Sequence, residues 1–445
     1  MATLTPFDLV SAAEQLLQNA KAFAASRIPG QEDDLRDLRR AIAQTARKIW
    51  LETAPTPDVS AEVNCTNLFI DWKAFDHIPL DGHISVADLA RKVDAEEALV
   101  ARIANLLLCT GRLLPGPRDA SASPTLRHSR ISRLFLSHTN LAALYTVCIG
   151  HVAKPGCHWP EYFDIYGRHE PRARTIPTPP GPTDGSQHTS DPGRGGPAAS
   201  TKMAVITPFS YAWGRPDLTP DEIKARYPKL TAAFARGMSG NRVTGDYPRR
   251  MTGPGAVYDY SWIGEEARKM PGDARVVVDV GGELGHLLVD LLRDVDGLRP
   301  EQCVLQGRGK VIERAMKERG DGVLKGVWMM GCDFLEEQPV KGALAYILRH
   351  CLVNHTDRAA TNILRHLADA LPKDNPKARV IIIEEKFPSP PVPSQCLLDI
   401  GMLNLGGKLR NEEMLRKVAE PAGLIMVGYY ARDEDTLAMA ECKRA

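Results

Sequence analysis

The stretch VVVDVGGELGH, from Val276 to His286, joins an apolar run to a glycine-rich turn. The run ends around Asp279, and Gly281, Gly282 and Gly285 then lead into an amphipathic segment. Glycines at the carboxyl end of a buried strand let a ligand approach the backbone and the following helix N-terminus. The spacing is G-G-x-x-G, which predicts either such a ligand site or a tight strand-to-helix turn without a ligand.

Around this stretch, apolar runs alternate with amphipathic ones. The short apolar runs, typical of buried strands, are Val276–Val280, Cys303–Leu305, Val327–Met330, Ala343–Leu348, Val380–Ile383 and Leu424–Val427. Amphipathic stretches between them are Val311–Arg319, Arg358–Leu371 and Glu412–Ala422. Buried parallel strands with crossover helices are the expected solution, so this half predicts a doubly wound α/β domain.

The first part of the chain has a helical pattern instead. Apolar residues recur at helical spacing over Leu35–Ile49, and a second helical cluster follows at 83–114. Ser85, followed by Asp88, predicts a helix N-cap. Two helices and a short extended segment at Arg112–Pro115 resemble a winged helix. Because the formal net charge is only +1, dimerisation or scaffolding is favoured over nucleic-acid binding.

A proline- and glycine-rich stretch separates these two halves. Pro177–Pro197 holds 11 Pro or Gly among 21 positions, a composition that cannot bury a core. The predicted organisation is therefore a helical domain over 1–165, a linker or loop over 166–202, and an α/β domain over 203–445.

Composition limits the class of protein further. With 43% hydrophobic and 25% charged residues, the chain has an ordinary globular composition. No apolar run is long enough to span a membrane, and the N-terminus lacks the pattern of a secretory signal. The 9 cysteines form no C-x-x-C pair, which predicts reduced thiols rather than a metal site or a disulfide framework. We expect a cytoplasmic protein without a bound metal.

Several segments in fixed order resemble one enzyme family. VDVGGELGH is followed by VWMMGCDFLEE, AYILRHCLVNH, RVIIIEEKF and LDIGMLNLGGKLR. Together they resemble the plant- and fungal-type class I O-methyltransferases, which depend on S-adenosylmethionine. The resemblance covers nearly the whole chain outside the proline-rich stretch. It implies a Rossmann-like methyltransferase domain with a seven-stranded sheet, an N-terminal winged-helix dimerisation domain and a homodimer that takes a small-molecule substrate.

The residue that removes the substrate proton in this family has no counterpart here. The family base is a histidine after the fourth strand, and Val353 stands at the matching position. Of the two acids that orient this base, Glu384 matches the first, whereas Leu409 replaces the second. His350 or His355 would have to substitute for the base if proton abstraction is retained, and each is more often an ordinary polar residue at a strand end.

The cofactor side of the resemblance is mixed. Asp279 and the three glycines match the family pattern, and Asp333 with Phe334 matches the segment near the adenine. Arg349 matches the basic residue that ends the fourth strand. Gly307, however, stands where the family usually has the acid that holds the ribose hydroxyls. We therefore expect S-adenosylmethionine to bind weakly, or not to be consumed.

An apolar Val353 and Leu409 in place of a catalytic pair resemble the O-methyltransferase-like pericyclases of fungal polyketide and pyridone pathways. This predicts a dehydration or cyclisation, of Alder-ene or hetero-Diels–Alder type, of a polyketide-derived pyridone alkaloid intermediate. Arg349, His350 and Thr244 are the candidate catalytic donors. Arg349 alternatively forms a structural ion pair, and Thr244 a turn hydroxyl. An active O-methyltransferase of a phenolic natural product and a catalytically silent scaffold are the alternatives.

Overall fold

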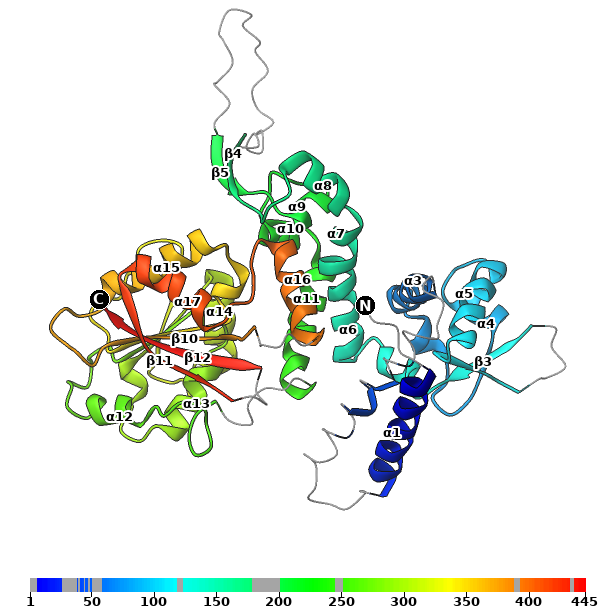
Figure 1. The fold of residues 1–445 in the computed structure, drawn as a ribbon, viewed down its shortest axis with the longest axis horizontal. Helices are drawn as coiled ribbons and strands as arrows, with labels where there is room; N and C mark the ends of the chain where they lie inside the picture. Colours follow the sequence, from blue (N-terminus) through cyan, green and yellow to red (C-terminus); the bar gives the residue numbers. More distant parts are fainter. Residues whose placement is uncertain are drawn as a thin grey trace, which may run out of the picture. The chain divides into compact units, whose positions relative to one another are not determined.

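The structure of the protein is a computed structural model. It describes residues 6–25, 38, 41–43, 45–46, 49, 58–117, 123–177, 201–244, 251–387, 393–432 and 436–445. The chain forms two compact units, Met1–Leu136 and Ser137–Ala445. Each is described by itself below, with the labels of Figure 1.

A seven-stranded sheet forms the centre of the second unit (Figure 1), with the strand order β11-β12-β10-β9-β6-β7-β8. The strands are β6 Val277–Val280, β7 Cys303–Gly307, β8 Trp328–Gly331, β9 Ala345–Arg349, β10 Arg379–Glu385, β11 Leu424–Ala431 and β12 Leu437–Arg444. Neighbours from β10 to β8 are parallel, whereas β12 runs antiparallel to β10 and β11. The chain passes from β8 to β9 across the sheet, so β6 and β9 flank its topological switch point.

Helices cover both faces of this sheet, because its strands are apolar on both sides. Val278, Tyr346 and Ile382 pack with α15 (Asp357–Ala370) and α17 (Glu412–Ala419). The alternate residues of the same strands pack on the opposite face against α12 (Ser261–Ala267), α13 (His286–Asp294) and α14 (Gly309–Arg319). The predicted doubly wound α/β domain is confirmed, and each of the six apolar runs contributes a strand.

A layer of helices from two parts of the sequence also belongs to this unit. It comprises α6 Asn140–Cys148, the π-helix η3 Ile149–Ala153, α7 Lys154–Cys157, α8 Trp159–Tyr166, α9 Pro208–Ala212, α10 Pro220–Arg226, α11 Pro228–Thr244 and α16 Pro393–Leu405. Asn404 of α16 links two of these helices, because its amide donates to the His151 carbonyl (3.0 Å) and accepts from the Trp159 indole (2.7 Å). The predicted boundary near residue 165 thus falls among helices that pack together.

The ends of the proline-rich stretch lie side by side. β4 (Ala173–Pro177) pairs antiparallel with β5 (Thr201–Val205). The chain therefore leaves and re-enters the unit at one place, which is the arrangement of a loop. Residues 178–200 themselves lie outside the described residues.

The first unit contains α1 (Pro6–Ala25), α3 (Asp58–Asp71), α4 (Val86–Lys92) and α5 (Glu97–Cys109). A three-stranded antiparallel sheet follows the order β1-β3-β2, with β1 Ile84–Ser85, β2 Leu113–Pro115 and β3 Thr125–His128. The predicted N-cap is confirmed: Ser85 Oγ accepts from the Asp88 backbone N–H (3.0 Å). Most of the predicted helix over Leu35–Ile49 lies outside the described residues. Among the helices that the structure describes, none is long and apolar enough to cross a membrane.

Short 3-10 turns complete the second unit at the sheet edges. They are η4 Pro300–Gln302, η5 Leu352–Asn354 and η6 Glu420–Ala422. The turn η5 follows β9 directly and carries Val353, so it places this residue at the carboxyl edge of the sheet.

Candidate functional site

The glycine turn after β6 has the backbone that its sequence predicts. Gly281 (φ +70°) and Gly285 (φ +69°) adopt the left-handed conformation that disfavours other residues. A Cβ on Gly281 would lie 2.9 Å from Cys351 Sγ, and a Cβ on Gly282 would overlap the Asp279 carboxylate. The turn therefore packs closely against the end of β6 and against Cys351, which follows β9.

Asp279 lies beneath this turn with an incompletely satisfied carboxylate. Its side chain is 1% exposed, and Oδ2 has no hydrogen-bond partner in the described part of the chain. Burial raises the Asp279 pKa to about 6; the charge of Arg349 opposes this rise, and that of Glu283 adds to it. A buried carboxylate oxygen without a partner is costly, so it indicates a place for a positively charged or hydrogen-bond-donating ligand.

Arg349 and His350 lie at the neighbouring strand end. Arg349 ends β9, where it pairs in register with Ile383 of β10. Within the described ranges, the Arg349 guanidinium forms no hydrogen bond or ion pair, and its charge lowers the pKa of Asp279 against the effect of burial. His350 has a left-handed backbone (φ +53°) and donates its backbone N–H to the Ile383 carbonyl (3.0 Å). The uncommitted guanidinium is thus close enough to the Asp279 carboxylate to influence it.

Val353 and Leu409, where the resemblance implied a base and an acid, are both buried. Val353 is 8% exposed and Leu409 is 1% exposed. Glu384 of β10 is also buried, and its Oε1 accepts from the Leu352 backbone N–H (2.6 Å). Its Oε2 has no partner among the described residues. Burial raises the Glu384 pKa to about 7, although the hydrogen bond from Leu352 opposes this rise.

Arg410 fixes the same turn from the other side, and the sequence analysis did not identify it. Its buried guanidinium donates to the carbonyls of Leu352 (2.8 Å) and His355 (2.8 Å) and pairs with Asp357 (2.9 Å). In sequence, its signal is a cation directly after Leu409, in a segment that resembles a catalytic motif. Glu384 and Arg410 together determine where Val353 and the end of β9 lie.

The other sequence-predicted residues lie around this edge with different surroundings. Asp333 is exposed, and its Oδ1 accepts from the Leu335 backbone N–H (3.0 Å). The Phe334 ring meets His355 edge to face, with 5.7 Å between centroids, and also lies against Gly281. Burial lowers the His355 pKa. Thr244 is the last residue of α11, and its side chain lies outside what the structure describes, so its role stays a prediction.

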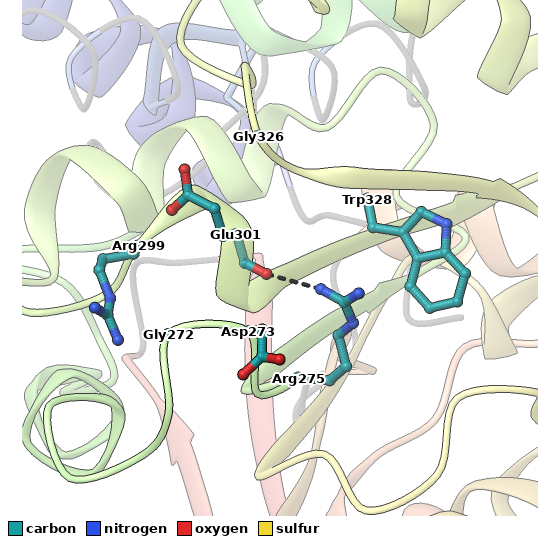
Figure 2. Close-up of a pocket in the computed structure, with 7 residues that line it drawn as sticks. All are labelled: Gly272, Asp273, Arg275, Arg299, Glu301, Gly326 and Trp328. Atoms are coloured by element: carbon teal, nitrogen blue, oxygen red, sulfur yellow. Dashed lines mark hydrogen bonds between the residues drawn. The ribbon is translucent and has the colours of Figure 1, made fainter.

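A pocket of about 570 Å³ lies at the other edge of the sheet (Figure 2), where β6, β7 and β8 begin. Figure 2 shows Arg275 reaching the Glu301 carbonyl (2.8 Å) beside Trp328, whose ring centroid is 4.8 Å from the guanidinium carbon. Ligands of open α/β sheets bind at the carboxyl ends of the strands. We therefore place the candidate ligand site at the glycine turn and not in this pocket. No group of three or more potential metal-ligating side chains occurs among the described residues.

A doubly wound sheet with an antiparallel last strand and a glycine turn after β6 defines a class I methyltransferase fold. Residues 269–425 match the family model of the O-methyltransferase domain. The chain is 33% identical over 421 residues to the methyltransferase cfoD of Aspergillus candidus, covering 92% of this chain and 93% of cfoD. It belongs to this O-methyltransferase family and has fungal relatives.

Two solved structures share the fold. The crystal structure of OxaC in complex with sinefungin and meleagrin superposes with a TM-score of 0.72 at 16% identity, covering 99% of this chain and 100% of OxaC. A structure described as a pericyclic reaction enzyme superposes with a TM-score of 0.66 at 18% identity, covering 99% and 100% of the two chains. Both likenesses concern the fold alone.

Proposed function

We propose that the chain is an S-adenosylmethionine-dependent methyltransferase that acts on an acidic small molecule of a fungal biosynthetic pathway. The observation that carries this proposal is the close-packed glycine turn above the unpartnered Asp279 carboxylate. The name of the relative cfoD, a methyltransferase, supports it over nearly the full length of both chains. OxaC supports it further, because sinefungin is an analogue of this cofactor.

The residues present fit the cofactor. Gly281, Gly282 and Gly285 place no side chain of their own at the turn, and Asp279 offers a negative charge to a cationic ligand. When bound, the cofactor supplies the methyl group. The chain itself contributes the positioning of the acceptor and the exclusion of water by the apolar surface around Val353.

The acceptor must lose its proton without a histidine base. Val353 cannot accept a proton, and Glu384 already accepts a hydrogen bond from the Leu352 amide. The enol of a tricarbonyl system, or a phenol that carries strongly electron-withdrawing groups, is largely ionised near neutral pH and needs no such base. Arg349, which has no ion-pair partner among the described residues, would hold the resulting anion.

Pericyclic catalysis is the second candidate, because Val353 and Leu409 are apolar and buried, and Val353 lies on the turn that follows the strand ending at Arg349. In this function, Arg349, with His350 or Thr244, would polarise the carbonyl of a polyketide-derived pyridone intermediate during an Alder-ene or hetero-Diels–Alder cyclisation. The shared fold of the pericyclic reaction enzyme supports it. It uses the same guanidinium but transfers no methyl group.

One experiment separates these functions. The purified protein is incubated with acidic polyketide-derived substrates, with and without S-adenosylmethionine, and the products are weighed by mass spectrometry. Methyl transfer gives a product one methylene heavier, only with the cofactor. Cyclisation gives an isomer, or a product lighter by one water. Unchanged substrate in both arms would contradict both functions and support a silent scaffold.

A further inference from the structure

Glu283 interrupts the glycine turn with a strained backbone. It lies between Gly282 and Gly285 and adopts φ +52°, one of four non-glycine residues with positive φ in the described chain. The left-handed region costs a residue with a Cβ about 1–2 kcal/mol. Such strain is found more often at functional sites than elsewhere. A glycine would fit this backbone without strain, so the side chain of Glu283 needs a reason.

The end of the adjacent strand lacks a side chain. Gly307 ends β7, where the family usually carries the acid that holds the cofactor ribose. A Cβ on Gly307 would lie 3.4 Å from Ile312 Cδ1 and 3.9 Å from the Glu283 backbone N. The empty side-chain position thus opens directly beside Glu283, within reach of a side chain with two methylenes.

The Glu283 carboxylate is available at this edge. The residue is exposed, and its carboxylate forms no hydrogen bond or ion pair with any residue that the structure describes. Its negative charge affects the pKa of ionisable groups on both sides of the turn. After burial as the main cause, it helps to raise the pKa of Asp279 in β6 and of Cys351 after β9.

We propose that the Glu283 carboxylate accepts hydrogen bonds from the ribose hydroxyls of S-adenosylmethionine and so replaces the acid absent at Gly307. This inference rests on the proposed function, because it concerns the same cofactor. A carboxylate that accepts from hydroxyls forms charge-assisted hydrogen bonds, which are stronger than neutral ones. Placing the acid in the turn after β6, rather than at the end of β7, keeps the ribose contact while freeing the end of β7.

The test is calorimetric titration with S-adenosylhomocysteine and with its analogue that lacks both ribose hydroxyls. We expect Glu283→Gln to weaken binding of the intact ligand about 10-fold or more, as for a lost charged hydrogen bond. The same change should leave affinity for the dideoxy analogue unaltered. Glu283→Gly, which also removes the backbone strain, should weaken binding of the intact ligand by a similar factor. Glu313→Gln, an exposed acid on the nearby α14, is the matched control.

A second variant tests whether the two positions are interchangeable. Because Gly307 has an ordinary φ and a Cβ there would meet its neighbours only at ordinary van der Waals distances, Gly307→Asp combined with Glu283→Gln should restore most of the lost affinity. Equal affinity of Glu283→Gln and the unchanged protein would overturn the inference, as would equal losses for both ligands. Absence of any ligand binding would overturn both this inference and the proposed methyl transfer. Tight, Glu283-dependent binding without methylated product would contradict methyl transfer alone.

Discussion

The Glu384 carboxylate accepts a hydrogen bond from the Leu352 backbone amide, with 2.6 Å between Oε1 and N. In the resembled family, the matching acid orients a catalytic histidine. Here the next residue along the turn is Val353, so the acid stabilises backbone instead of a base. Glu384 is thus a buried carboxyl group that holds the turn after β9, and its ionisation has a cost in free energy.

This cost predicts a pH dependence of stability. The Glu384 pKa is raised from 4.5 to about 7 on folding. Below about pH 4.5 the group is protonated in both states, and as pH rises through 7 only the folded state resists ionisation. The unfolding free energy should fall over this interval by up to about 3 kcal/mol. Asp279, raised from 3.8 to about 6, acts in the same direction.

Glu384→Gln tests the assignment, because glutamine still accepts from Leu352 but does not ionise. Urea unfolding at pH 5, 6, 7 and 8 should show a shallower fall for this variant and a gain in stability at pH 8 of about 1–3 kcal/mol. Glu420→Gln, which changes an exposed acid, should keep the slope of the unchanged protein. An identical slope for Glu384→Gln would mean that another group titrates.

Truncation of Arg410 should reduce the unfolding free energy more than truncation of most other residues in this unit. Arg410→Ala removes the donors to the carbonyls of Leu352 and His355 and leaves them buried without partners. We expect a loss of about 3 kcal/mol in unfolding free energy. Arg365→Ala, at an exposed arginine on α15, should change stability by less than about 0.5 kcal/mol. Comparable losses for both variants would refute the special role of Arg410.

Gly281 should be needed for cofactor binding because of its close packing. Gly281→Ala places a Cβ 2.9 Å from Cys351 Sγ, whereas Gly255→Ala meets nothing within 4 Å at a similar φ of +85°. Both changes carry the left-handed backbone cost of about 1–2 kcal/mol in stability. Only Gly281→Ala should weaken the binding of S-adenosylhomocysteine, with an increase in Kd of about 10-fold or more in calorimetry. Equal affinities of the two variants would argue against a ligand at the turn.

The fold could be predicted from the sequence where burial alone determines structure. Runs such as Val380–Ile383 are buried on both faces, so their apolar composition identified them without tertiary information. β12 was missed, because LAMAECKR carries Glu441 and Lys443 among small residues and resembles a surface segment. Its position between β10 and β11 depends on long-range pairing, which periodicity does not report.

The sequence allowed us to name candidate residues for the site, but not the hydrogen bonds and backbone conformations that surround them. The hydrogen bond from the Leu352 amide to Glu384 could not be predicted from the sequence, since that contact requires β10 to lie beside the turn after β9. The strain at Glu283 was invisible for a related reason: a left-handed φ is a property of the folded turn. The place of Arg349 at a strand end could be predicted from its motif, because topology determines position there; its role in a site stays a prediction.

The helical first unit provides a prediction about assembly. Val10 and Leu17 of α1 are 57% and 55% exposed, and their spacing of two turns places them on one helix face. An exposed apolar face on a helix fits the homodimer that the family resemblance implies. Light scattering should give the mass of a dimer for the unchanged protein and of a monomer for Val10→Glu with Leu17→Glu. Val323→Glu, at an exposed valine of the second unit, should remain dimeric.

Arg349 is the residue on which both proposed functions depend. It ends β9 at the carboxyl edge of the sheet and has no ion-pair partner in the described part of the chain. If it stabilises an anionic acceptor or polarises a carbonyl in the transition state, Arg349→Ala should lower turnover about 10²–10³-fold, as for the loss of one oxyanion donor. Arg349→Lys should recover only part, because an ammonium lacks the planar fork of the guanidinium. Turnover is measured from the product mass signal, and melting curves of both variants are compared with the unchanged protein. A variant Arg349→Ala that melts normally and keeps full turnover and product selectivity would transfer the role to His350 or Thr244.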